Sequence, residues 1–101
     1  MAQAELTPGV WIIVPTPFLA GAGEPVDLDA LGTIVRFMAE LGVTGVTVAG
    51  VLGEGAKLTE SERFEIVARA VAESDGLPVC VGSNGGSPAI VADRLTRARA
   101  A

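Results

Sequence analysis

A glycine-bounded turn is the stretch of this sequence best suited to bind a ligand. It reads Gly50-Val51-Leu52-Gly53 and lies between an apolar run and the start of a helical pattern. Successive backbone N–H groups in such a turn form a concave site for an anion such as a carboxylate. Val51 and Leu52 bring no polar side chain, so the backbone amides of residues 51–53 would bind the anion. The alternative is a tight turn that joins a strand to a helix and binds nothing.

Polar residues also follow the first and third apolar runs of the sequence. Thr16 comes just after the first run, where its hydroxyl either lines a binding site or satisfies the proline-flanked turn at 15–17. Ser83 and Asn84 end the third run, where they either reach a ligand or serve the turn. All three are candidate substrate-binding residues.

Charged side chains stand directly behind the glycine-bounded turn. Glu54 is expected to orient the loop by accepting backbone N–H bonds, the alternative being a solvated carboxylate. Lys57 is the only lysine of the chain, but a nucleophilic lysine needs a desolvated site that lowers its pKa. Because Lys57 lies in a polar loop before a helix cap, we expect a surface lysine. Glu60, Glu62 and Arg63 are interpreted as helix-start residues and surface charge.

Length and composition argue against several classes of protein. With 101 residues, half of them apolar, the chain forms one domain at most. Its net charge of −5 argues against a nucleic-acid-binding module, which needs a basic face. A single cysteine, Cys80, and the absence of histidine leave no plausible zinc site and no disulfide framework. The sequence has neither a signal-peptide pattern nor a membrane-spanning run, so we expect a soluble cytoplasmic protein.

Strands and helices alternate along the chain and position these residues. Apolar runs rich in β-branched residues predict strands near 10–14, 45–50 and 78–82. The strand-to-helix links are longer and richer in glycine and proline than the helix-to-strand links. Ligands bind at the carboxyl ends of strands in parallel α/β folds. The candidate residues therefore lie on the loops that such a fold uses for binding.

Helical periodicity follows each predicted strand. The side chains suited to cap the three helices are Asp27, Thr59 and Ser87. Gly42 and Gly76 are expected to end the first two helices. The buried stripe of the second helix is predicted to consist of Phe64, Val67, Ala68 and Val71. That of the third helix is predicted to consist of Ile90, Val91, Leu95 and Ala98.

Three successive βα units begin two architectures, the (β/α)8 barrel and the doubly wound open sheet. The nucleotide-binding form of the open sheet needs G-x-G-x-x-G directly after a strand, whereas the first loop has only Gly21 and Gly23. The nucleotide-binding open sheet is therefore disfavoured, and the strand order separates the two architectures. Sequential strands in the order 1-2-3 would indicate the barrel. A third strand on the far side of the first would indicate the open sheet instead.

A set of motifs in fixed order resembles the dihydrodipicolinate synthase / N-acetylneuraminate lyase family. Residues 50–63, GVLGEGAKLTESER, are similar to that family's G-[ST]-T-G-E followed by a T-L-T-x-x-E-R-like helix start. Further stretches that agree in order and spacing are residues 15–18, 26–28, 41–45 and 78–84. The resemblance spans nearly all 101 residues.

The resemblance implies a lyase or aldolase that acts on pyruvate or another 2-keto acid through a lysine Schiff base, with no further cofactor. The chain, residues 1–101, would be a partial TIM-barrel domain that covers about the first three eighths of a (β/α)8 barrel, with parallel strands in the order 1-2-3 and right-handed crossovers. The reactive lysine on the sixth strand and a proton-relaying tyrosine would both lie outside it, and the chain has no tyrosine. We therefore assign no catalytic residue to this chain and expect it to be inactive alone. The resemblance also implies a homo-oligomer, a tetramer, for the full-length protein.

The sequence departs from the family at the glycine-bounded turn. There the family carries two hydroxyl residues that, with their backbone amides, hold the substrate carboxylate, and one hydroxyl also relays protons. Val51 and Leu52 occupy both positions here, which favours a bulkier or less polar 2-keto acid. The second interpretation is a catalytically silent fragment or split-barrel partner that works only by association, because no fourth strand covers the third.

Overall fold

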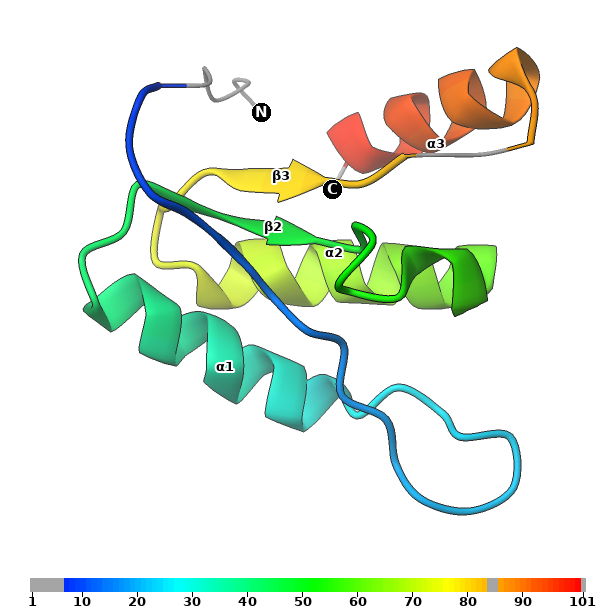
Figure 1. Cartoon of the computed structure of the whole chain (residues 1–101), viewed down its shortest axis with the longest axis horizontal. Helices are drawn as coiled ribbons and strands as arrows, with labels where there is room; N and C mark the ends of the chain where they lie inside the picture. The colour runs from blue at the N-terminus through cyan, green and yellow to red at the C-terminus, as the bar shows by residue number, and fades with distance from the viewer. Residues whose placement is uncertain (1–6, 84–85, 101) are drawn as a thin grey trace.

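Three strands alternate with three α-helices along the chain. The computed structural model describes residues 7–83 and 86–100. The elements in order are β1 (Trp11–Ile13), α1 (Leu28–Glu40), β2 (Gly45–Val48), the 3-10 helix η1 (Gly55–Lys57), α2 (Glu60–Glu73), β3 (Val79–Val81) and α3 (Pro88–Arg99). Figure 1 shows the long link between β1 and α1 as an extended loop beside the sheet.

The strands form one parallel sheet in the order β1-β2-β3, which confirms the predicted order. In the register, Trp11 pairs with Gly45, and Val46 pairs with Val79. The strands are shorter than predicted, but backbone pairing continues beyond their ends. The N–H of Val14 donates to Thr47 O at 2.8 Å, and the N–H of Gly82 donates to Val48 O at 2.9 Å.

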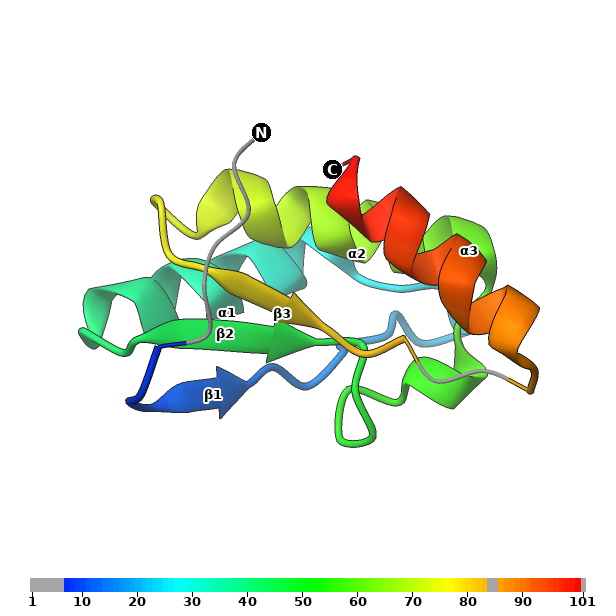
Figure 2. The same ribbon diagram turned by 90° about the horizontal axis from the view of Figure 1, so that it is seen from above.

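Helices α1 and α2 cover one face of the sheet, as Figure 2 shows. Val46 and Val48 alternate along β2 and are almost completely buried. They belong to a core cluster that also includes Val14, Leu31, Val35, Ala49, Leu58, Ile66, Val67 and Ala70. Burial of these side chains is the main force that holds the two helices on the sheet, at about 25 cal/mol per Å² of apolar surface.

The predicted caps position the helix ends. Asp27 accepts a hydrogen bond from Ala30 N at 3.0 Å, and Thr59 forms a capping box with Glu62. Gly42 adopts a φ of 78° directly after α1, as expected for a helix-terminating glycine. Helix α2 ends at Glu73, three residues before the predicted Gly76. Within the described residues no helix is long and apolar enough to cross a membrane.

The predicted buried stripes of α2 and α3 are partly wrong. Ala68 is exposed, whereas the buried residues of α2 are Arg63, Ile66, Val67 and Ala70. Helix α3 has no buried residue along Pro88–Arg99. It contacts α2 through an ion pair of Arg94 with Glu60 and through Arg97, which lies over the Phe64 ring. Ile90 and Leu95 are exposed.

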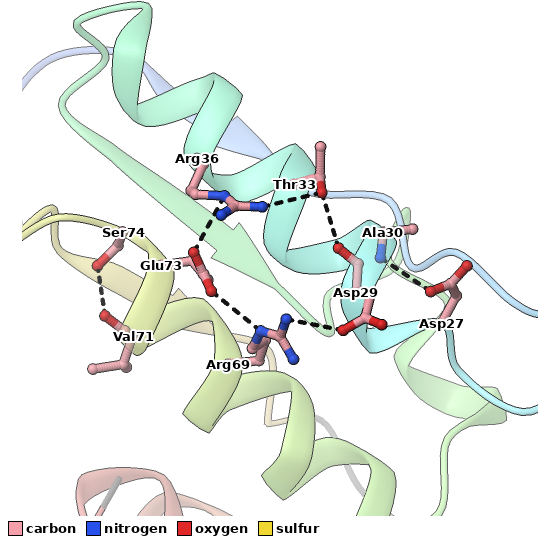
Figure 3. A network of polar contacts seen from close by, with 9 residues as sticks. All are labelled: Asp27, Asp29, Ala30, Thr33, Arg36, Arg69, Val71, Glu73 and Ser74. Carbon is pink, nitrogen blue, oxygen red and sulfur yellow. Dashed lines mark hydrogen bonds and ion pairs between the residues drawn. The ribbon is translucent and has the colours of Figure 1, made fainter.

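An ion-pair network joins α1 to α2 on the outer surface (Figure 3). The Glu73 carboxylate accepts from Arg36 and from Arg69, each at 3.3 Å, and Arg69 also reaches Asp29 at 3.0 Å. Gly32 of α1 leaves room for this network, because a Cβ there would lie 3.0 Å from Arg69 Nε. The two helices pack closely where these charges meet.

Candidate functional site

The loop after β2 is the centre of the candidate site. In Figure 2 it leaves the carboxyl end of β2 on the side of the sheet away from α1 and α2. The N–H of Glu54 donates to Val51 O and the N–H of Gly55 donates to Gly50 O, both at 3.0 Å. These two bonds close residues 50–55 into a compact turn. The turn projects at the edge where parallel α/β folds bind ligands.

Consecutive amides of this turn have no partner in the described part of the chain. The N–H groups of Gly50, Val51, Leu52 and Gly53 donate to no acceptor within residues 7–83 and 86–100. The side chains of the central pair extend into solvent, with Val51 84% and Leu52 67% exposed. The turn thus combines free backbone donors with exposed apolar side chains.

Thr16 holds the turn from the neighbouring loop after β1. Its hydroxyl, in a residue only 6% exposed, donates to Gly53 O at 2.5 Å. This hydrogen bond connects the loop after β1 to the loop after β2. Because the Gly53 carbonyl is engaged in this way, the position of the turn depends on Thr16.

Glu54 and Lys57 form a surface ion pair beside the turn. The Nζ of Lys57 lies 2.8 Å from Oε1 of Glu54, and the lysine side chain is 73% exposed. The hydrogen bond with Glu54, and then the charge of that carboxylate, raise the pKa of Lys57. A Schiff-base lysine needs the opposite shift. The structure confirms that Lys57 is a surface lysine. The contact described for the Glu54 carboxylate is this ion pair with Lys57.

Ser83 is the described candidate on the loop after β3. It is half-buried and follows Gly82, whose N–H continues the pairing with β2. Asn84, the other candidate there, lies outside the described residues. Cys80 is half-buried on β3. Among the residues described, no three His, Cys, Asp or Glu side chains gather into a potential metal site.

Arg63 is buried, so its interpretation as surface charge is wrong. It is 6% exposed, and its Nη1 donates to Gly55 O at 2.9 Å while its Nη2 donates to Gly82 O. Burial, and then the charge of Arg94, lower the pKa of Arg63. Its spacing from Val67 and Ala70, four and seven residues on, matches the buried face of α2. That spacing was the signal for its burial.

The chain matches known proteins over most of its length. The model of the dihydrodipicolinate synthetase family matches residues 7–99. The trans-O-hydroxybenzylidenepyruvate hydratase-aldolase of Sphingobium xenophagum is 32% identical over 93 residues, which cover 82% of this chain and 28% of that protein. The 4-hydroxy-tetrahydrodipicolinate synthase of Thermotoga maritima is 37% identical over 76 residues, covering 74% of this chain and 25% of that protein. The crystal structure of dihydrodipicolinate synthase from Rhodopseudomonas palustris has a TM-score of 0.85 at 29% identity, covering 93% of this chain and 31% of that one.

These matches agree with the observed topology. Three parallel βα units in the order β1-β2-β3 are the start of a (β/α)8 barrel, the fold of the matched synthases. The chain spans about 25% to 31% of the length of these relatives. By their names, these relatives are a hydratase-aldolase and synthases. The chain belongs to the dihydrodipicolinate synthetase family.

Proposed function

We propose that residues 1–101 form about the first three eighths of a (β/α)8 lyase or aldolase that acts on a 2-keto acid through a lysine Schiff base. The reactive lysine and the relay tyrosine come from outside these residues, and no side chain of this chain reacts. Family membership and the share of each relative that the chain spans support this proposal. A homo-oligomeric, tetrameric full-length enzyme belongs to the same proposal and rests on the family resemblance. A cytoplasmic location is also part of this proposal.

The observation that carries the proposal is the set of free amides in the turn at 50–53. The substrate carboxylate binds to these N–H groups, chiefly those of Val51, Leu52 and Gly53. A carboxylate that accepts several backbone N–H bonds is well stabilised, because hydrogen bonds to a charged group are roughly twice as strong as neutral ones. Thr16 fixes the turn through Gly53 O. Ser83 and Asn84 approach the substrate from the loop after β3.

The exposed pair at the tip of the turn selects the substrate. Val51 and Leu52 contribute no hydroxyl, so they pack against an apolar part of a 2-keto acid larger than pyruvate. Their exposure in this chain supports that role, because it leaves both side chains available for contact. The name of one relative, a hydratase-aldolase of a benzylidenepyruvate, also supports a substrate with an apolar group.

A second candidate is that the chain itself is catalytically silent and works only when other βα units complete it. The exposure of α3 favours this candidate, because Ile90 and Leu95 are 42% and 49% exposed. In the described sheet, β3 is also an edge strand that pairs only with β2. An uncovered edge strand is a template for association with another chain.

Exchange of the apolar pair tests the first proposal. In the full-length enzyme, Val51→Thr combined with Leu52→Thr should improve turnover of pyruvate and impair turnover of the larger native substrate. A restored relay hydroxyl contributes about 10²–10⁴-fold to the proton-transfer step. Ala56→Thr, which adds a hydroxyl at an exposed position outside the turn, is the matched control and should change neither. If the double variant leaves the affinity for every 2-keto acid unchanged, the turn binds no substrate.

A further inference from the structure

Arg63 connects two loops of the candidate site. Its guanidinium lies beneath the start of α2 and donates to Gly55 O, behind the glycine-bounded turn, and to Gly82 O, at the end of β3. No carboxylate among the described residues forms an ion pair with it. A buried charge is costly unless it is compensated. Here two backbone carbonyls, one on each loop, accept hydrogen bonds from the guanidinium, and the charge of the Glu60 carboxylate also favours it.

The backbones of these two loops also touch each other. A Cβ on Gly55 would lie 2.2 Å from Ala49 O, and a Cβ on Gly82 would lie 2.3 Å from the same oxygen. The Ala49 carbonyl is therefore enclosed between the two glycines. The planar fork of an arginine donates in fixed directions, so Arg63 sets the separation of the loops that pack around this carbonyl.

We propose that Arg63 is a positioning residue that holds the amides of residues 50–53 in register with the loop after β3. This inference rests on the proposed function, in which those amides bind the substrate carboxylate. Arg63 does not itself contact the substrate. It acts through Gly55 and Gly82, so its loss displaces the carboxylate site relative to Ser83. Small displacements of a binding group weaken positioning strongly.

Substitution of Arg63 in the complete enzyme tests this inference. Arg63→Met removes both donors, and Arg63→Lys keeps the charge but lacks the fork. The matched control is Val35→Ala, a substitution in the core on α1 that should lower the melting temperature but removes no hydrogen-bond donor to either loop. Arg63→Met should raise KM for the 2-keto acid about tenfold, with a smaller change in kcat, because carboxylate binding is shared by ground and transition states. Arg63→Lys should give an intermediate KM, and Val35→Ala should leave it within about twofold.

Hydrogen exchange gives a second measurement that does not depend on turnover. Peptides covering residues 50–58 and 79–83 should exchange faster in Arg63→Met than in Val35→Ala. If the wild-type enzyme shows no saturable turnover of any 2-keto acid, the proposed function fails, and hydrogen exchange alone decides the role of Arg63. Equal exchange in Arg63→Met and Val35→Ala, or an equal rise of KM in both, would overturn the inference. If Arg63→Met does not fold, Arg63→Lys enters the same comparison.

Discussion

Replacing Gly55 by alanine tests how tightly the loop after β2 is packed. The new Cβ would lie 2.2 Å from Ala49 O and 3.2 Å from Arg63 Nη1. Carbon and oxygen in close contact are about 3.3 Å apart, so the loop would have to move by about 1 Å. Overpacking of this kind costs about 1–3 kcal/mol. The φ of Gly55 lies outside the positive region, so the steric contact alone produces the effect.

Gly50→Ala is the control for this substitution. Its Cβ would lie 3.9 Å from Thr47 Cγ2, which is ordinary contact distance. Alanine also restricts the unfolded chain, so this variant should be neutral or more stable by up to about 1 kcal/mol. Urea unfolding, followed by the fluorescence of the only tryptophan, Trp11, measures both variants. If Gly55→Ala and Gly50→Ala unfold at the same urea concentration, that result would contradict the close packing of Gly55 against the Ala49 carbonyl.

Three further predictions concern single side chains. Thr16→Val should destabilise the chain by about 1–3 kcal/mol because it leaves the Gly53 carbonyl unpaired, whereas Thr16→Ser should retain most of the stability in the same urea assay. The hydrogen bond and charge of Arg94 lower the pKa of Glu60 in the folded chain. The ionised Glu60 therefore stabilises the fold at any pH above its pKa in the unfolded chain. This stabilisation is lost as the pH falls through its pKa in the folded chain. Glu60→Gln should therefore lower the urea midpoint at pH 7 and not at low pH; a difference that persists in acid would contradict this. The chain alone should show no lyase or aldolase turnover. After borohydride trapping with pyruvate, mass spectrometry should find Lys57 unmodified, and a reduced pyruvyl adduct on Lys57 would contradict this prediction.

Local signals made much of the fold predictable. The caps Asp27 and Thr59 depend on residues three positions away, which a sequence displays directly. The positions of the strands followed from apolar runs. The role of Gly42 at the end of α1 followed from the left-handed conformation that a helix end often requires. The order β1-β2-β3 was not settled by such local signals and was predicted from the family resemblance, which implies a barrel.

Contacts between distant residues were not predictable in the same way. The Thr16 hydroxyl bonds to a carbonyl 37 residues away, and Arg63 bonds to carbonyls 8 and 19 residues away. A charged residue in a helix start suggests solvent exposure by its type, and only the tertiary fold places backbone acceptors around it. The inward stripe predicted for α3 failed for a related reason, because periodicity indicates which side chains share a face but not whether another element covers it.

In the turn at 50–53, the groups that hold the loop in place are different from the side chains that a ligand would contact. Its frame consists of backbone bonds and the Thr16 hydroxyl, and these contacts do not involve the side chains of Val51 and Leu52. Substitutions at these two positions can therefore accumulate with little effect on folding, within about 0.5 kcal/mol for exposed sites. Under the proposed function, natural selection could alter the ligand preference of this loop by changing two codons, while the scaffold that presents the loop stays the same.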